Sequence, residues 1–545
     1  MRAKTSRLAA NQAPPLPDHD AIRSDAGLVS AILLYADQAT VDDLGPLGSA
    51  AGSQTAREHG RLANVNPPRL RTHDRYGNRI DEVDFHPSWH WLMQRGVGFG
   101  LQAAPWTSAA PQAHLGRAAG FYAWSQVEAG HGCPLSMTYA SVPALRTDPA
   151  LFAEWTPRLA STEYDPGLRP TAAKGGALAG MAMTEKQGGS DVRSNQTVAV
   201  PTAVDGEYLL TGHKWFCSAP MNDVFLVLAQ TASGLTCFLV PRVLPDGDRN
   251  AFAIQRLKDK LGNRSNASAE VEFGETWAQR LGEEGRGVST IIEMVAATRL
   301  DCVLGSAALM RRALTEAVWH TSHRQAFGSA LVDKPLMANV LADLALESEA
   351  ATALAMRLAA AVDRPDDAHE RALRRIGLPL AKFWVCKRAP FMIAEALECL
   401  GGNGYVEESG MPLLLRESPL NSIWEGSGNL NALDLLRALS GGPEAIEAWM
   451  AEVGEVRGAN RSLDIAIEDV LTSLSDLSDL ERRARRLAAR MAQCLQGALL
   501  VRDSPAEIAD AWCASRLGGD WAGTFGTMAR DVECTKILSR GLPSG

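Results

Sequence analysis

The sequence lacks the features of a membrane-embedded or secreted protein. Among its 545 residues, no apolar run approaches the ~20 residues that are needed to span a bilayer. The first seven residues are basic, but the apolar segment of about 7–15 residues that characterises a secretory signal does not follow them. We therefore expect no membrane insertion and a cytoplasmic location.

Recognisable metal and disulfide motifs are also missing. The nine cysteines form no C-x-x-C pair and are odd in number, which favours reduced and mostly buried thiols. His86 and His90 lie four residues apart, but the acidic residue that follows the first histidine of a zincin motif is absent. We therefore assign no metal site.

Positive charge and aromatic residues are scarce overall. The formal net charge is -9, so the chain as a whole does not attract nucleic acid, and such a partner would need a local basic patch. Aromatics make up only 6% of the residues, whereas the many alanines and leucines favour helix. A 46% hydrophobic chain of this length is typical of a globular protein with three or four domains.

The residue pattern predicts a mainly α protein with a central β domain. Short apolar runs at 224–229 and 235–240, and the aromatic-rich segment 207–218, are typical of strands. Helical periodicity returns afterwards, with a buried stripe expected at Val303, Ala307, Met310, Leu314 and Ala317. The expected segments are a flexible arm (1–25), N-terminal helices (26–175), a β domain (176–285), a helical bundle (286–440) and an appended helical domain (441–545).

Two polar segments carry the strongest chemical signals. Residues 183–191, Met-Thr-Glu-Lys-Gln-Gly-Gly-Ser-Asp, combine hydroxyls with glycines that let backbone amides approach an anion, without forming a Rossmann G-x-G-x-x-G. Residues 421–429 place the carboxylate of Glu425 between Trp424 and Gly426, on a loop after Pro419. Taken alone, the first segment is better explained as a polar strand-to-turn transition, and Glu425 in the second as a solvated loop carboxylate.

Together with three further motifs, these segments resemble the acyl-CoA dehydrogenase family of flavoproteins. The motifs are residues 212–218, the R-x-x-F-G of residues 324–328, and the glycine turn of residues 400–405. The resemblance implies N-terminal helices, a β-barrel-like middle domain, a C-terminal helical bundle, and FAD as cofactor. It also implies a homo-oligomer, a dimer or tetramer, in which Arg324 reaches the cofactor of a neighbouring subunit, and an acyl-CoA-type substrate.

The resemblance carries the cofactor site over residue by residue. Met183 and Thr184 are expected at the flavin edge, Ser190 at the pyrophosphate, Phe216 against the ring and Ser218 facing N5. Phe216 and Ser218 stand where the family usually has Trp and Thr, and Glu398 replaces a usual Gln before the glycine turn. The other expected cofactor contacts are Cys217, Arg324, Phe327, Gly401, Gly402, Ile423, Trp424, Ser427 and Asn429.

Glu425 aligns with the family's catalytic base. The α-proton of a thioester is weakly acidic, so its base needs a raised pKa, which burial beside Trp424 would provide. The resemblance implies that Glu425 abstracts the α-proton while the β-hydrogen leaves as hydride. Trp424 replaces a usual Tyr and would enlarge the wall beside the substrate.

Longer matches at residues 60–68, 183–192, 256–268 and 421–429 resemble the AidB branch of the family. That branch is associated with the bacterial response to DNA alkylation and has an appended helical domain linked to double-stranded DNA. Arg482, Arg486 and Arg490 lie four residues apart on one expected helix face and could meet phosphates. Because residues 445–545 hold 12 basic and 15 acidic residues, a solvated face is the alternative. A DNA-binding flavoprotein with weak or vestigial dehydrogenase activity is therefore the second hypothesis.

Overall fold

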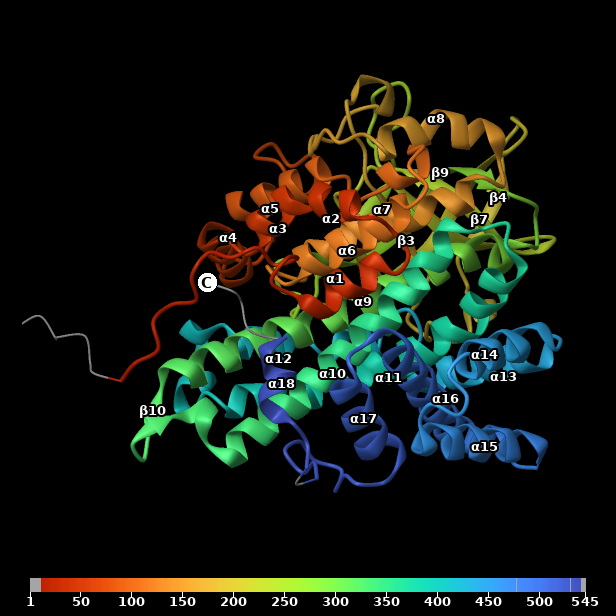
Figure 1. Cartoon of the computed structure of the whole chain (residues 1–545). Helices are drawn as coiled ribbons and strands as arrows, with labels where there is room; N and C mark the ends of the chain where they lie inside the picture. Colours follow the sequence, from red (N-terminus) through yellow and green to blue (C-terminus); the bar gives the residue numbers. More distant parts are fainter. Residues whose placement is uncertain (1–10, 477, 530, 541–545) are drawn as a thin grey trace, which may run out of the picture. The chain divides into compact units, whose positions relative to one another are not determined.

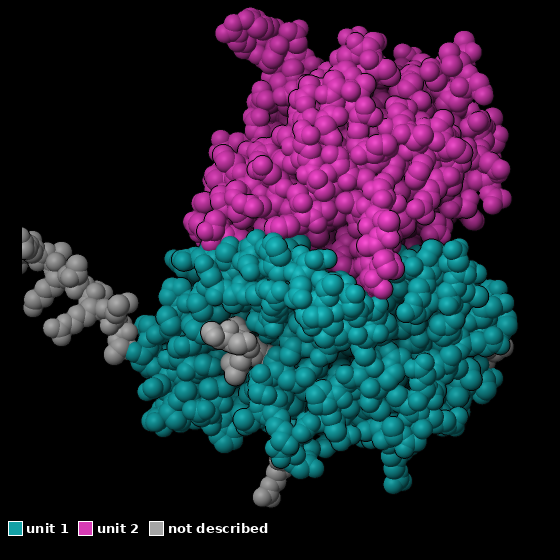
Figure 2. Space-filling view, turned by 45° about the horizontal axis from the view of Figure 1, so that its top comes forward, with its two compact units in different colours: residues 1–54, 302–545 teal, residues 55–301 magenta. Residues whose placement is uncertain are grey.

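The computed structural model describes residues 11–476, 478–529 and 531–540. The chain forms two compact units, one made of residues 1–54 and 302–545 and the other of residues 55–301 (Figure 2). These boundaries differ from the segments that the sequence pattern predicts, since the first unit takes both ends of the chain. Residues 1–10 of the predicted flexible arm lie outside the described residues.

The unit of residues 55–301 opens with helices. His86 caps the helix α5, as its side chain accepts a hydrogen bond from the amide of Ser88 at 3.2 Å, and Pro87 occupies the first helical position. His90 instead contacts the hydroxyl of Tyr164 at 2.9 Å. The helices here are α4 (Gln54–Val65), α5 (Pro87–Gly98), α6 (Ala113–Ser125), α7 (Gly132–Leu145) and α8 (Pro149–Leu159).

A β-hairpin, which the sequence pattern does not predict, interrupts these helices. Strands β1 (Arg69–His73) and β2 (Arg79–Asp84) pair antiparallel. Asp74 accepts hydrogen bonds from the amides of Tyr76 and Asn78, and Gly77 has a φ of +88°, so the turn is built from residues suited to it. The N-terminal helices expected over 26–175 are therefore accompanied by two short strands, whose only apolar residues, Leu70, Ile80 and Val83, gave no clear strand pattern.

The β domain closes into a barrel. Five strands form a ring in the order β6-β4-β5-β9-β7, since β7 pairs with both β9 and β6, while β3 and β8 add to its edges. Strands β5, β6 and β7 match the segments predicted as strands. The strands are β3 (Ala179–Ala182), β4 (Val198–Pro201), β5 (Glu207–Ser218), β6 (Val224–Thr231), β7 (Gly234–Pro241), β8 (Phe252–Leu257) and β9 (Ser268–Leu281).

Long helices dominate the other unit (Figure 1). The helix α9 (Gly287–His323) continues into this unit from Cys302, and the predicted stripe from Val303 to Ala317 is fully buried. Residues 11–25 contact the end of α9, where the indole of Trp319 donates to the carbonyl of Pro14 at 2.8 Å. The other helices up to residue 440 are α1 (Ala26–Leu33), α2 (Gln38–Asp43), α3 (Gly45–Ala51), α10 (Pro335–Ala360), α11 (Ala368–Glu398), α12 (Met411–Glu417) and α13 (Gly428–Ser440).

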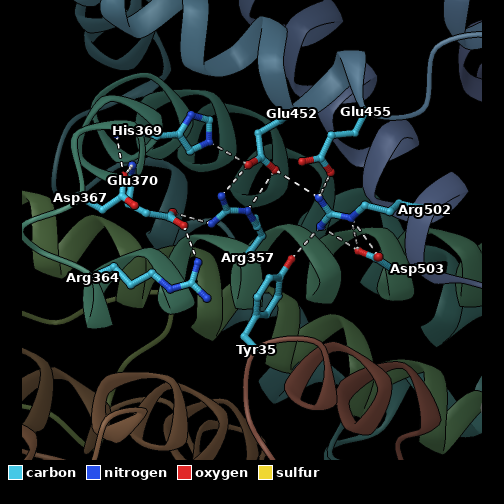
Figure 3. Close-up of polar contacts among 10 residues, drawn as sticks. All are labelled: Tyr35, Arg357, Arg364, Asp367, His369, Glu370, Glu452, Glu455, Arg502 and Asp503. Atoms are coloured by element: carbon cyan, nitrogen blue, oxygen red, sulfur yellow. Dashed lines mark hydrogen bonds and ion pairs between the residues drawn. The ribbon is translucent and has the colours of Figure 1, made fainter.

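The C-terminal segment packs on α10 and α11 within the same unit. A buried ionic network joins it to them: Arg357 of α10 contacts Glu370 of α11 at 2.7 Å and Glu452 of α14 at 3.0 Å (Figure 3). Arg502 of α16 extends the network to Tyr35. The segment contains α14 (Glu444–Gly454), α15 (Arg461–Ser475), α16 (Leu480–Asp503), α17 (Ala506–Trp512), a π-helical turn (Cys513–Leu517) and α18 (Cys534–Ser539).

No helix in the described part of the chain combines the length and apolarity that a membrane crossing requires. Within the same residues, no group of histidine, cysteine or acidic side chains has the arrangement of a metal site. All nine cysteines are free thiols, and all except Cys534 are buried.

Candidate functional site

A buried ion pair joins the first two predicted cofactor segments. Lys214 of β5 donates to the carboxylate of Glu185 at 2.7 Å, and both side chains are fully buried. Burial alone would raise the pKa of Glu185, but the amide of Gln196, the Lys214 ammonium and the hydroxyl of Thr197 together lower it to about 2, from 4.5. This carboxylate stabilises the folded state above about pH 4.5, and the contribution is lost as the pH falls toward 2. Glu185 is therefore structural.

The first segment presents unpaired hydroxyls. The carbonyl of Thr184 accepts from the amide of Trp215 at 2.8 Å, which fixes the segment against β5. Within the described residues, the hydroxyls of Thr184, Ser190 and Ser218 form no hydrogen bond, and none of the three side chains is buried. A Cβ added at Gly189 would lie 2.4 Å from the Thr184 hydroxyl, so this close turn requires glycine.

The end of β5 alternates as a strand must. Phe216 is 50% exposed, whereas Cys217 is fully buried in the barrel core, where burial raises the pKa of its thiol to about 12. Any cofactor contact of Cys217 would therefore come through its main chain. Lys258 was not predicted as a site residue, yet its ammonium lies 4.5 Å from the centre of the Phe216 ring and 3.7 Å from that of Trp215. In the sequence, Lys258 was marked only by its place in the segment 256–268, which resembles the AidB branch.

The R-x-x-F-G motif forms a short hairpin after α9. Strands β10 (Gln325–Ala326) and β11 (Ser329–Ala330) pair antiparallel, and Phe327 at their turn is 98% exposed with a φ of +50°. Arg324 precedes the hairpin, is partly exposed, and donates to the carbonyl of Asn11. Phe327 therefore buries almost none of its side chain against the rest of the described chain.

The glycine turn follows α11 directly. Gly401 has a φ of +59°, and a Cβ added at Gly401 or Gly402 would meet no atom within 4 Å, so these two residues leave open space above the backbone. Gly404 is different, because an added Cβ would lie 2.2 Å from the carbonyl oxygen of Leu397. The turn therefore depends sterically on Gly404, which the sequence analysis did not single out.

The loop at residues 421–429 holds Glu425 in an unusual backbone conformation. Its φ is +57°, in the left-handed region, and Gly426 follows at +99°. The indole of Trp424 donates to the side-chain oxygen of Asn421 at 2.9 Å, so the aromatic residue beside Glu425 is fixed. Ile423 is 62% exposed. Non-glycine residues in this region are strained and cluster at functional sites.

The far end of this loop begins α13 and contacts α16. Ser427 caps α13 without a side-chain hydrogen bond, and it is exposed. The Asn429 side chain accepts a hydrogen bond from Arg485 at 3.1 Å. Two further residues, Lys382 and Asn431, hold the loop through its carbonyl oxygens. Neither carried a signal in the sequence, since both contacts depend on tertiary structure.

The predicted basic face of α16 is only partly free. Arg482 and Arg486 are exposed, and neither has a hydrogen bond or ion pair within the described part of the chain. Arg490 is partly buried and donates to the carbonyl of Arg516 at 3.3 Å. Two of the three predicted arginines therefore remain available to an anion.

The residues present fit a flavin nucleotide, with each unit taken by itself. In residues 55–301, three free hydroxyls and an exposed aromatic ring offer donors and an apolar surface. In the other unit, the open turn at Gly401 and Gly402 leaves backbone accessible to a polar group. A planar ring with polar edges requires an apolar surface and hydrogen-bond donors, and a pyrophosphate requires donors, so the groups present suit both.

Comparison with known proteins identifies the family. The family model described as "Adaptive response protein AidB N-terminal domain" matches residues 11–166. The models of the acyl-CoA dehydrogenase middle and C-terminal domains match residues 180–276 and 285–440. AidB of Escherichia coli strain K12 is 46% identical over 92% of this chain and 93% of its own length. Acyl-CoA dehydrogenase family member 11 of Caenorhabditis elegans is 31% identical over 84% of this chain and 79% of its own.

A solved structure agrees with this assignment. The crystal structure of C. elegans ACDH-11 in complex with C11-CoA superposes with a TM-score of 0.87 and 26% identity, covering 99% of this chain and 97% of that one. The helical architecture with a central β domain is thus the one predicted from the motifs. The chain belongs to the acyl-CoA dehydrogenase family and is similar to its AidB members.

Proposed function

We propose that this protein oxidises the Cα–Cβ bond of an acyl thioester with Glu425 as the general base. Family membership supports an FAD-dependent oxidoreductase that acts on CH–CH bonds. The observation that carries the assignment of the base is the left-handed conformation of Glu425 between a fixed Trp424 and Gly426. An acyl-CoA is the proposed substrate, because ACDH-11 is described in complex with C11-CoA.

In this proposal the protein binds, orients and deprotonates the substrate. The Glu425 carboxylate accepts the α-proton, and Trp424 forms the wall beside the acyl chain. Thr184 and Ser218 donate hydrogen bonds to the ring edge, Ser190 donates to the pyrophosphate, and Phe216 packs on the ring. The remaining proposed contacts are Met183, the main chain of Cys217, Gly401, Gly402, Ile423, Ser427 and Asn429. When bound, FAD supplies the acceptor for the hydride that leaves Cβ.

Anaerobic flavin bleaching tests the proposal. The purified protein should be yellow and should lose its flavin absorbance when mixed with one member of a series of acyl-CoAs of different chain length and branching. A flavin-containing protein that no acyl thioester bleaches would contradict the assignment as a dehydrogenase of acyl-CoA.

The exposed hairpin supports self-association, in which Arg324 reaches the cofactor of a second subunit. Phe327→Ala should weaken the dimer by about 1.5–3 kcal/mol for each ring buried in the interface, because Phe327 is 98% exposed in the single chain. Arg324→Ala should lower both assembly and the FAD retained per subunit. Sedimentation velocity and flavin absorbance per protein measure the two effects.

A matched control for the hairpin is Tyr76→Ala, since Tyr76 is a 73% exposed aromatic at the turn between β1 and β2. This substitution should change neither assembly nor FAD content. Equal sedimentation of Phe327→Ala and wild-type protein at concentrations near the dissociation constant would place the interface elsewhere.

A second function, binding of double-stranded DNA, rests on the free arginines of α16. Each phosphate contact contributes about 0.9 to the slope of log affinity against log salt. Arg482→Ala combined with Arg486→Ala should therefore reduce that slope by about 1.8 and weaken binding equally for all duplex sequences. Arg490→Ala alone should change the slope much less, because Arg490 contacts Arg516. An unchanged slope in the double variant would show that the face is only solvated.

A further inference from the structure

The backbone around Glu425 is not held by regular secondary structure. The 3-10 turn η8 (Leu420–Ser422) ends before it and α13 begins after it, at Gly428. Glu425 and Gly426 both have positive φ, and a glutamate in that conformation is less stable than one in the right-handed or extended region. Something outside the loop must hold the conformation, because a local sequence preference does not.

Lys382 provides that hold from the middle of α11. Its side chain is 1% exposed, and its ammonium donates to the carbonyl oxygens of Asn421 at 2.6 Å, Trp424 at 2.9 Å and Gly426 at 3.0 Å. An ammonium has three protons, so all of its donors are used. The described residues place no acidic group in an ion pair with it, and the three carbonyl dipoles take the place of a counterion.

The three carbonyls lie on both sides of Glu425. Those of Asn421 and Trp424 precede it and that of Gly426 follows it, so one charged group fixes both ends of the short segment that carries the carboxylate. The second support acts on one side only, since the amide of Asn431 donates to Gly426 at 2.7 Å and to Ser427 at 3.0 Å. Rotation of the Trp424–Glu425 peptide or of the Gly426–Ser427 peptide would therefore break a contact with Lys382.

Two further basic residues lie near the contacts between Lys382 and the loop, which we call the Lys382 clamp. Lys387 lies five residues further along α11, and a Cβ added at Gly428 would come within 2.4 Å of its Cε. Burial lowers the pKa of Lys387, as do the neighbouring charges of Arg485 and Lys382. Lys382 differs from Lys387 and Arg485 because its ammonium donates to the carbonyls that flank Glu425.

We propose that Lys382 is a positioning residue for the reaction, holding the main chain of residues 421–426 so that the Glu425 carboxylate stays in its productive orientation. The proposal rests on the proposed function of Glu425 as base. It assigns to a buried lysine on a structural helix a role in turnover, exerted through the loop without contact with the substrate. A misplacement of about 1 Å can cost about 100-fold in rate, which sets the size of the expected effect.

The test compares Lys382→Met with a control, Ile376→Ala, in the FAD-loaded full-length protein. Methionine keeps the length and apolar stem of the side chain but removes all three donors. Ile376 is a fully buried apolar residue on the same helix, and its truncation reproduces a general loss of packing. Two quantities are measured: hydrogen–deuterium exchange of the amides of residues 420–431, and anaerobic flavin reduction over a range of acyl-CoA concentrations.

In Lys382→Met we expect faster exchange confined to residues 420–431 and a limiting rate constant for flavin reduction about 100-fold lower. The half-saturating acyl-CoA concentration should stay within about twofold of wild type, because uniform binding is not removed. In Ile376→Ala the limiting rate constant should match that of wild type. Equal exchange and equal rate constants in the two variants would overturn the proposal.

Failure of the proposed function gives a separate result. If no acyl-CoA reduces the wild-type flavin, the dehydrogenase assignment fails, and exchange alone decides: faster exchange limited to the loop supports the clamp, and unchanged exchange overturns it. If Lys382→Met does not fold, the experiment uses Lys382→Gln instead, because the glutamine amide retains one donor group. A wild-type limiting rate constant in that variant would overturn the proposal, and a reduced one with unchanged half-saturation supports it.

Discussion

Replacing Glu425 by Gln should lower the rate constant of flavin reduction by about 10²–10⁴-fold, the usual effect of removing a general base. Glutamine keeps the shape of the side chain but cannot accept the α-proton at neutral pH. The flavin content should be unchanged, since Glu425 is not proposed to bind the cofactor. Anaerobic stopped-flow reduction by an acyl-CoA such as isovaleryl-CoA, with wild type and variant compared at saturation, measures the effect.

Glu408→Gln is a suitable control for this prediction. Glu408 is an exposed glutamate in the short turn before α12, and its change removes the same charge without touching the loop. It should reduce the flavin at the wild-type rate. An undiminished rate in Glu425→Gln would move the base to another residue. No reduction in any of the three proteins would favour the DNA-binding hypothesis over the enzyme.

Local patterns predicted those parts of the fold whose signals are themselves local. Strands β6 and β7 are short apolar runs between turns, and the buried face of α9 repeats at helical spacing, so both were identified from the sequence. The β1–β2 hairpin was missed, because its strands are short and hold few apolar residues. Its clearest signal was the turn at Asp74 and Gly77.

Among the site residues, too, those in local motifs were predicted from the sequence and their distant partners were not. Thr184, Phe216, Phe327 and Glu425 lie in contiguous motifs, so the sequence alone made them candidates. The partners that hold these motifs come from distant positions: Lys214 pairs with Glu185, 29 residues away, and Lys382 contacts a carbonyl 42 residues away. Buried lysines of this kind look like surface residues in a single sequence, and only the tertiary structure shows what they bind.

The same limit applies to the ionic network of Figure 3, where the second large effect is expected. Arg357→Met should destabilise the protein by about 3–5 kcal/mol, because it leaves the carboxylates of Glu370 and Glu452 buried without their main partner. Burial would raise the pKa of Glu452, and Arg357 and His369 lower it below its usual range. Urea unfolding at neutral pH, followed by helical circular dichroism, measures the loss.

Arg364→Met separates this network from a surface ion pair. Arg364 contacts the same Glu370 at 2.9 Å, but its side chain is 54% exposed, so its loss should cost no more than about 1 kcal/mol. The stability difference between Arg357→Met and wild type should shrink as the pH falls through about 4.5, because protonation neutralises the unpaired carboxylates in the variant and weakens the wild-type pairs. Equal losses in both variants, or a deficit independent of pH, would contradict this account. Because Glu452 lies on α14, the loss also measures how strongly this ionic network binds the C-terminal helices to α10 and α11.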